Sequence, residues 1–362
     1  MEPLRLAILG QGRSGRDIHG VHLLTRPERF RIVAVVEPLP ERRTRAEAEY
    51  GCRTYGHYTE LFGRTDLDLI VNSTPSHLHV PITTDLLDHG FNVLCEKPFA
   101  RKAEEVDSMI RASERNGKLL AIFQQSRFAP YFNKAKEIAD SGILGRIVQV
   151  SIAFSGFARR WDWQCLQANN GGNLLNTGPH PLDQALRFLD FPGMPSVLCQ
   201  MDRANTFGDA EDYVKLILTA PGRPLIDLEI SSCNAYPSFT YHLQGTKGGL
   251  KGSMTRLDWK YFIPAEALPQ KLIRTPLMQA DGTPAYCVEN LDWHEDHWDL
   301  PESQQNLFGT MTGAYYDMLY QAMAEGVPLL VTHQQVRHQI AVIEECHRQN
   351  PLSCMEEDAS VL

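Results

Sequence analysis

Residues 4–20, LRLAILGQGRSGRDIHG, decide the fold of the first half of the chain. A short apolar run ends in a glycine turn, and a helix-like segment follows. Gly10, Gly12 and Gly15 fit the pattern G-x-G-x-x-G, whose glycines allow a tight turn, close approach of a pyrophosphate, and close packing of helix on strand. The pattern predicts a dinucleotide-binding turn formed by Gly10, Gln11, Gly12, Arg13, Ser14 and Gly15.

An acidic residue at the end of the next apolar run supports a nucleotide cofactor. Glu37 lies 22 residues beyond Gly15, where it can accept hydrogen bonds from a ribose diol. Its carboxylate would repel a 2′-phosphate, which favours NAD over NADP, although Arg42 and Arg43 could weaken that preference. The alternative is an ordinary glycine turn followed by a surface glutamate.

The order of apolar runs divides the 362 residues into two parts, the number of domains expected at this length. Residues 1–124 alternate strand and helix patterns, which predicts an α/β domain with a parallel sheet covered on both faces. Residues 125–362 are richer in successive strand patterns, which predicts an α+β domain with a largely antiparallel sheet. In that part we expect an irregular excursion at 258–308 and a C-terminal helix at about 333–349.

The composition argues against several classes of partner. The chain is 43% apolar and 22% charged, and its formal net charge of −9 argues against general binding to nucleic acid or to an anionic membrane surface. The eight cysteines form no C-x-x-C pair, as expected for reduced thiols in the cytosol. The sequence begins with a strand, leaving no room for a signal peptide, and no apolar run reaches the roughly 18 residues that span a bilayer. We therefore expect a soluble, cytoplasmic protein.

Polar residues and prolines follow two further predicted strands. The segments are TPSHLHVP, residues 74–81, and EKP, residues 96–98. Ligands of open α/β sheets bind at the carboxyl ends of the strands. Lys97 is therefore expected at the mouth of the cofactor crevice, where a fixed cation can stabilise a developing alkoxide. The alternative is a solvated surface lysine.

A third polar segment is NNGGNLLNTGPHPLD, residues 169–183. Intervals of four and three residues predict that Asn176, His180 and Asp183 share one face of a helix. His180 can carry or accept a proton near neutral pH. The alternative is a helix start in which Asn176 or Thr177 caps the backbone and His180 is a satisfied core histidine.

Taken in order, the glycine pattern, TPSHLH, EKP and GGNLLNTGPHPLD resemble the Gfo/Idh/MocA oxidoreductases, from the first strand to about residue 349. The resemblance implies a Rossmann domain followed by a domain with a large mixed sheet, a nicotinamide cofactor, a sugar or polyol substrate, and a homodimer or homotetramer. It implies that Lys97 is the active-site lysine and His180 the general acid/base. It also implies that the cofactor is contacted by Thr74, Pro75, His79, Glu96 and Lys97.

One position departs from the family pattern. Four residues before the histidine the family often has aspartate, whereas this chain has Asn176. Asparagine can orient a substrate as a neutral acceptor and donor, but it brings one negative charge fewer to the site. The expected mechanism is that His180 removes the proton of a secondary alcohol while Lys97 holds its oxygen, and Asn176 and Asp183 orient substrate or histidine. The alternative for Asp183 is a structural hydrogen-bond partner.

Two aromatic segments remain. RRWDWQ, residues 159–164, offers Arg160, Trp161 and Trp163 as contacts for a pyranose ring, with core tryptophans and surface arginines as the alternative. WHEDHW, residues 293–298, resembles a metal site, but in an extended segment neighbouring side chains point to opposite faces, so no metal is expected. A subunit contact or a pocket lid is the preferred hypothesis there.

Three functions are compatible with these residues. The first is an NAD-dependent dehydrogenase acting on a sugar, a sugar derivative or a cyclitol. The second is a glycoside hydrolase or lyase that keeps NAD bound and works through a transient keto-sugar, with which the altered Asn176 would agree. The third is a sensor of cofactor or sugar without turnover, against which Lys97 and His180 argue.

Overall fold

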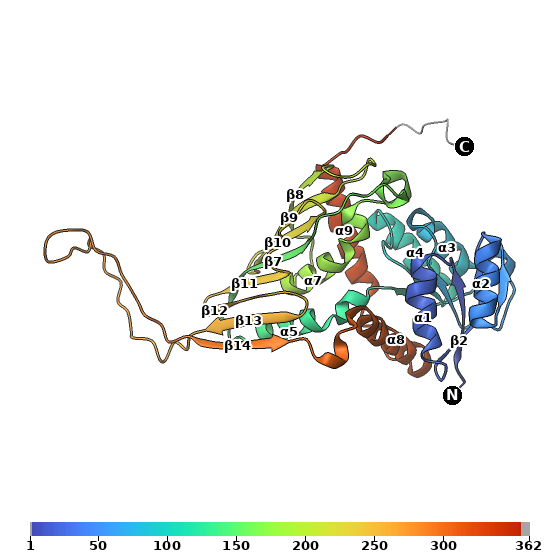
Figure 1. The fold of residues 1–362 in the computed structure, drawn as a ribbon, viewed down its shortest axis with the longest axis horizontal. Helices are drawn as coiled ribbons and strands as arrows, with labels where there is room; N and C mark the ends of the chain where they lie inside the picture. Colours follow the sequence, from blue (N-terminus) through green and yellow to red (C-terminus); the bar gives the residue numbers. More distant parts are fainter. Residues whose placement is uncertain (1, 356–362) are drawn as a thin grey trace.

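The computed structural model describes residues 2–355 and contains two sheets (Figure 1). The first sheet has the strand order β3-β2-β1-β4-β5-β6 and is parallel throughout, which confirms the Rossmann fold. Its strands are β1 (Leu4–Leu9), β2 (Phe30–Val36), β3 (Arg53–Tyr55), β4 (Leu69–Asn72), β5 (Val93–Cys95) and β6 (Leu120–Ile122).

Helices connect these strands, as their alternating pattern requires. They are the π-type turn η1 (Arg13–Gly20), which continues into α1 (Val21–Leu24), then α2 (Pro40–Tyr50), α3 (His79–Asp88) and α4 (Ala103–Asn116). Strands β1, β4 and β5 are buried almost throughout because the sheet is covered on both faces. The order of the strands reverses between β1 and β4, and a crevice for a ligand forms at such a point.

The second sheet confirms the mostly antiparallel mixed architecture. Its order is β14-β13-β12-β11-β7-β10-β9-β8, and only the pair β7–β10 is parallel. The strands are β7 (Ile147–Ser155), β8 (Ser196–Asp202), β9 (Tyr213–Thr219), β10 (Leu225–Ser231), β11 (Tyr241–Gly245), β12 (Gly248–Gly252), β13 (Arg256–Tyr261) and β14 (His294–Asp299).

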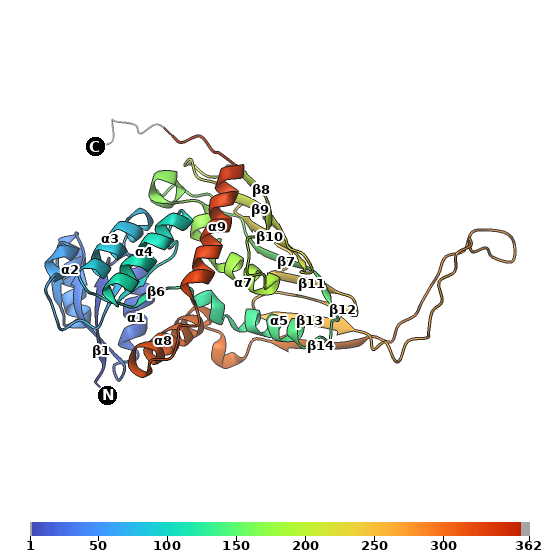
Figure 2. The same cartoon turned by 180° about the vertical axis from the view of Figure 1, so that it is seen from behind.

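Helices cover one face of this sheet and leave the other open (Figure 2). The covering helices are α5 (Pro130–Asp140), α7 (Pro179–Leu189) and α9 (His333–Gln349). Alternate residues such as Leu228, Leu243 and Leu250 are buried beneath them, whereas the intervening side chains are polar. None of the helices within residues 2–355 combines the length and hydropathy that crossing a bilayer requires.

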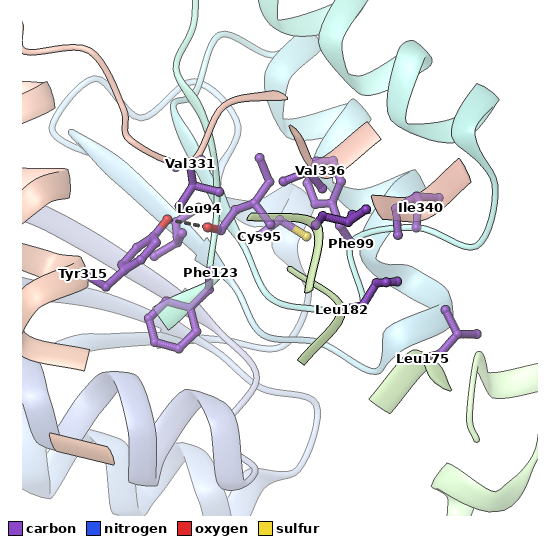
Figure 3. Packing of buried hydrophobic residues seen from close by; sticks show 14 of the residues in the cluster. Leu94, Cys95, Phe99, Phe123, Leu175, Leu182, Tyr315, Val331, Val336 and Ile340 are labelled. Atoms are coloured by element: carbon purple, nitrogen blue, oxygen red, sulfur yellow. Dashed lines mark hydrogen bonds between the residues drawn. The ribbon is translucent and has the colours of Figure 1, made fainter. Parts of the chain in front are cut away.

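The C-terminal helices return to the Rossmann domain. Helix α8 (Leu307–Glu325) places the Tyr315 hydroxyl 2.6 Å from the carbonyl oxygen of Ile122, to which it donates. Helix α9 begins with a capping box in which Thr332 and Gln335 exchange hydrogen bonds. Figure 3 shows apolar side chains of both halves in one cluster, namely Leu94, Phe99, Phe123, Leu182, Val331, Val336 and Ile340.

The expected excursion at 258–308 is wrong at its edges. Strand β13 continues to Tyr261 and strand β14 occupies His294–Asp299, so the chain leaves the sheet at 262–293 and again after Asp299, where it leads to helix α8. We call residues 262–293 the arm; it extends far from the body of the molecule (Figure 1). The β14 strand was missed because its residues HEDHWD lack apolar alternation: as an edge strand with one uncovered face it buries little.

Candidate active site

The glycine turn lies at the strand reversal, where it leaves room for a phosphate. Gly10 has φ +88°, and a Cβ on it would lie 2.7 Å from the carbonyl oxygen of Ser73. A Cβ on Gly15 would lie 1.9 Å from the carbonyl oxygen of Gly10. A Cβ on Gly12 would meet no atom within 4 Å, because it would enter open space in front of the turn. The turn therefore fits the pyrophosphate of a dinucleotide.

Glu37 is held beside that turn by backbone donors. Its carboxylate, 4% exposed, accepts hydrogen bonds from the N–H groups of Gln11 at 2.7 Å and Leu39 at 3.1 Å. Arg42 lies 3.6 Å from the carboxylate, whereas Arg43 donates to the carbonyl oxygen of Glu37. Glu37 therefore lies beside the glycine turn, and its contact with a ribose stays a prediction.

Lys97 follows the carboxyl end of β5, and His180 lies near enough for the lysine charge to lower the pKa of its imidazole. The Lys97 Nζ donates to the backbone carbonyl of Asn176 at 2.8 Å and lies 3.5 Å from its side-chain oxygen. The His180 Nδ1 lies 3.2 Å from the Ser126 hydroxyl, and its Nε2 has no hydrogen-bond partner among residues 2–355. Ser126, in the turn η4 (Gln125–Phe128), carried no sequence signal for this role.

Burial lowers the pKa of both groups. It lowers the pKa of Lys97, Glu96 opposes that effect, and the positive charges of Arg13 and Arg160 add to it. Burial and then the charge of Lys97 lower the pKa of His180 to about 3. His180 is therefore neutral at pH 7, with a ring nitrogen free to accept a proton.

Glu96 fixes the loop that carries Lys97. One of its oxygens lies 3.2 Å from the His19 Nε2 and the other accepts the Lys97 N–H at 3.0 Å, while the His19 Nδ1 lies 2.7 Å from the Tyr316 hydroxyl. Burial acts to raise the pKa of Glu96, but the hydrogen bond to His19 and the nearby positive charge outweigh it and lower that pKa to about 2. His19 and Tyr316 were missed, because they lie 297 residues apart in sequence.

His79 joins the other strand-end loop to the same place. Its buried ring lies between the carbonyl oxygens of Pro98, at 2.7 Å, and Thr74, at 2.9 Å. The Thr74 hydroxyl in turn donates to the side chain of Asn72 at 2.7 Å. The exposed Pro75 follows directly. Since its ring nitrogens already face carbonyls, His79 positions this loop.

The segment 169–183 is two helices. Asn176 ends α6 (Asn173–Asn176), and His180 and Asp183 lie on α7, which starts at Pro179. The Asp183 carboxylate is engaged by the guanidinium of Arg127, at 2.6 Å and 2.5 Å. Asp183 thus pairs α7 with the η4 turn, whereas Asn176 faces Lys97, and a role of Asp183 in orienting substrate or His180 stays a prediction.

A buried glutamate that sequence reasoning missed supports α6. The Glu211 side chain accepts the N–H of Leu174 at 2.9 Å, and its backbone carbonyl accepts the N–H of Asn173 at 2.8 Å. It lies directly under Gly172, where a Cβ would come within 2.4 Å of the carboxylate. Burial raises the pKa of Glu211 to about 7. This residue thus holds the helix whose last residue contacts Lys97.

The predicted aromatic contacts lie on an exposed rim. Trp161 is 78% and Trp163 44% exposed, and Trp161 stands edge-on to Phe207. Arg160 pairs with Asp162 at 2.7 Å and also donates to Gln164. The indoles are thus not core residues, and Arg160 is near enough to Lys97 for its charge to lower the pKa of the ammonium.

The WHEDHW histidines have separate partners on β14. His294 lies 2.7 Å from Glu266 in the arm, and His297 lies 3.4 Å from Asp299. Within residues 2–355 no three His, Cys, Asp or Glu side chains converge as metal ligands would.

Comparison with known proteins identifies both halves. Residues 4–124 match the family model described as oxidoreductase family, NAD-binding Rossmann fold, and residues 132–251 match the GFO/IDH/MocA C-terminal domain. An uncharacterized oxidoreductase of Schizosaccharomyces pombe is 30% identical over 68% of this chain and 70% of its own length.

Two similar proteins have named activities. The 2,7-anhydro-N-acetylneuraminate hydratase of Mediterraneibacter gnavus is 28% identical over 70% of this chain and 68% of its own length. The D-glucoside 3-dehydrogenase of Escherichia coli is 28% identical over 54% of this chain and 56% of its own. An NAD-binding protein from Listeria innocua shares the fold, with a TM-score of 0.78 at 20% identity over 98% of this chain and all of its own.

The open space at Gly12 predicts a variant that folds but does not bind a dinucleotide. Replacing Gly12→Val should leave the melting temperature near that of the wild type, because no atom lies within 4 Å of the added Cβ. It should raise the Kd for NADH, followed by fluorescence, about tenfold or more, equivalent to about 1.4 kcal/mol. Gly156→Val, equally free of neighbours, is the control and should bind normally. Normal binding by the Gly12 variant would show that the phosphates lie elsewhere.

The raised pKa of Glu211 predicts a pH dependence of stability. The unfolded chain loses this proton near pH 4.5 and the folded chain near pH 7, so its contribution is full below pH 4.5 and is lost between pH 4.5 and 7. The loss should be about 3 kcal/mol. Glu211→Gln should remove that part of the decline when urea unfolding is measured at pH 5 and pH 8, whereas Glu289→Gln on the exposed arm should not. An unchanged decline in the Glu211 variant would contradict the assignment.

Proposed function

Because the chain belongs to the GFO/IDH/MocA oxidoreductase family, we propose that it is a dehydrogenase that oxidises a secondary hydroxyl of a sugar, sugar derivative or cyclitol with NAD. One observation carries the proposal: the Lys97 ammonium, the Asn176 side chain and a neutral His180 meet beside a glycine turn that fits a dinucleotide. A cation, an amide and a base are the groups that alcohol oxidation needs around one oxygen.

Each residue of the site would have its own role in the oxidation. NAD, held by the Gly10–Gly15 turn and Glu37, supplies the acceptor of the hydride. Lys97 keeps one N–H on the Asn176 carbonyl, which fixes its direction, and offers another to the substrate oxygen. With Nδ1–H directed at Ser126, the His180 Nε2 takes the hydroxyl proton. Because the pKa of His180 is about 3, the imidazolium returns this proton to water.

The rim supports a sugar as substrate. Trp161 and Trp163 offer apolar ring faces to the C–H surface of a pyranose, and Arg160 offers N–H donors to its hydroxyls. The similarity to a D-glucoside 3-dehydrogenase agrees with this class.

The surroundings of Glu37 favour NAD over NADP. Two backbone N–H groups hold its carboxylate at the turn, where it would repel a 2′-phosphate. One guanidinium nitrogen of Arg43 donates hydrogen bonds to the backbone carbonyls of Glu37 and Pro38. Arg45 donates to the backbone carbonyl of Gln11. Of the nearby arginines, Arg42 is the one that could turn toward such a phosphate.

A second function is supported by Asn176 and by the hydratase relative. In this alternative the sugar is oxidised transiently, the new carbonyl acidifies a neighbouring C–H, a group is eliminated or added, and the carbonyl is reduced again. With asparagine beside Lys97 in place of aspartate, the site has one negative charge fewer to balance the lysine. A sensor without turnover is less well supported, because it would not need a lysine and a neutral histidine near enough to interact electrostatically.

Lys97→Ala separates binding from turnover. The variant should bind NADH within about twofold of the wild type, because the glycine turn and Glu37 are untouched, and should lower kcat by about 10²–10³-fold. Lys102→Ala, an exposed lysine on the same segment, is the control and should keep full activity. A Lys97 variant with most of its activity would overturn the mechanism.

The amount of NADH formed per site decides between the two enzymatic functions. The purified protein is mixed with excess NAD and a panel of pyranoses, glycosides and inositols, and absorbance is followed with sugar analysis. We expect many equivalents of NADH per site with at least one substrate. At most one equivalent, with sugar consumed or cleaved, would establish the closed redox cycle instead, and neither change would favour the sensor.

A further inference from the structure

The rim of the site carries an arginine that no acidic group of the described chain neutralises. The guanidinium carbon of Arg159 lies 4.8 Å from the centre of the Phe207 ring, and Trp161 stands edge-on to the same ring at 6.2 Å. Both rings are more than half exposed. Among residues 2–355, Arg159 pairs with no carboxylate and its guanidinium donates no hydrogen bond. We call Arg159, Trp161 and Phe207 the rim platform.

The rim platform lies on the side of the site where Lys97 is found. The Phe207 N–H donates to the backbone carbonyl of Arg160 at 3.0 Å, which joins the loop of Phe207 to the segment before α6. The charges of Arg160 and of Arg13, in the glycine turn, reach the Lys97 ammonium and lower its pKa. Cations from three segments therefore act on one place, and Arg159 is the next residue along the rim.

The acids of these segments are already engaged. Asp162 pairs with Arg160 at 2.7 Å, and the buried Glu96 accepts the N–H of Lys97 at 3.0 Å. Asn176, beside the Lys97 ammonium, is a neutral amide. The acids that follow Phe207 are buried and accept backbone N–H groups, namely Asp209, Glu211 and Asp212. The mouth of the site therefore has an excess of positive charge, on a chain whose formal net charge is −9.

We propose that the substrate is an acidic sugar, a pyranose whose carboxylate or phosphate group pairs with Arg159 while a ring hydroxyl meets Lys97. The inference rests on the proposed function, because it takes Lys97 as the group that holds the reacting oxygen. A neutral sugar would leave the positive charge of the rim without a partner in the complex. An anionic sugar is attracted to that charge before contact and is held by it afterwards.

Arg159 suits an anion better than its neighbour does. The Arg160 guanidinium pairs with Asp162 and donates to Gln164, so its charge is largely balanced within the chain. The Arg159 guanidinium keeps its donors for a ligand, and its planar fork can donate two parallel hydrogen bonds to two oxygens of one carboxylate or phosphate. Its contact with the Phe207 ring restricts the motion of the guanidinium before a ligand arrives. Arg159 is therefore the residue that should select the charged sugar.

Binding of matched sugars tests the inference without requiring turnover. Calorimetry on the full chain with NADH compares the methyl glycoside of glucuronic acid with methyl glucoside, and glucose 6-phosphate with glucose. The corresponding galactose compounds are measured in the same way. In at least one pair the charged sugar should bind about tenfold more tightly or better, and the ratio of the two Kd values should fall as salt is added. Whether the carboxylate or the phosphate pair shows this ratio identifies the anionic group.

Three variants assign the preference to one side chain. Arg159→Gln should reduce the ratio of Kd values to about two or less, whereas Arg159→Lys, which keeps the charge but not the planar fork, should retain part of it. Arg31→Gln is the control and should keep the full ratio, because Arg31 is exposed at the amino end of β2, opposite the end of the sheet that carries the site. Equal or undetectable binding in every pair, or a ratio that Arg159→Gln leaves unchanged, would overturn the inference.

The same sugars separate this inference from the proposed function. Many turnovers on neutral sugars without tighter binding of the charged ones would support the dehydrogenase and overturn the acidic substrate. Tighter binding of a charged sugar through Arg159, with no NADH formed from it and NAD, would support the acidic ligand and count against the dehydrogenase.

Discussion

The buried carboxylate of Glu96 holds together the three segments on which the site depends. One oxygen lies within hydrogen-bond distance of the His19 ring, on the helix after the glycine turn, and the other accepts the backbone N–H of Lys97. The second ring nitrogen of His19 lies within hydrogen-bond distance of the Tyr316 hydroxyl on α8. In a low-dielectric interior such a charge is tolerated only when its oxygens are satisfied. The arrangement therefore fixes Lys97, the helix after the glycine turn and helix α8 relative to one another.

Local patterns predicted much of this molecule. The glycine turn, the apolar strands and the C-terminal helix at 333–349 could be recognised because each is encoded in consecutive residues. The three-residue β3 and the polar edge strand β14 could not be recognised. Neither strand buries enough side chains to give the sequence a regular alternation of apolar and polar residues. The pair Gly178–Pro179 indicates the break between α6 and α7. The helical spacing of the polar residues instead favoured one continuous helix.

The site was predictable where chemistry and local pattern coincide. Lys97 follows the end of a strand and His180 lies at the start of a helix. Ligands of α/β proteins commonly bind at such ends. Glu211 lies 37 residues from the N–H it accepts, and nothing in its neighbourhood shows that it will support α6. Asp183 shares α7 with His180, as the spacing predicts, but its partner, Arg127, is 56 residues away. Spacing shows which face a residue occupies and does not show what lies opposite.

The return of α9 to the Rossmann domain has a consequence for synthesis on the ribosome. Its His333 lies 2.7 Å from the Leu120 carbonyl at the start of β6, its Arg337 pairs with Asp107, and its Glu344 accepts the first N–H of α4. The first 124 residues leave the ribosome long before these partners exist. The nascent cofactor domain therefore exposes the flank of α4 and β6 until translation is nearly complete, and a truncated product would keep that apolar surface uncovered.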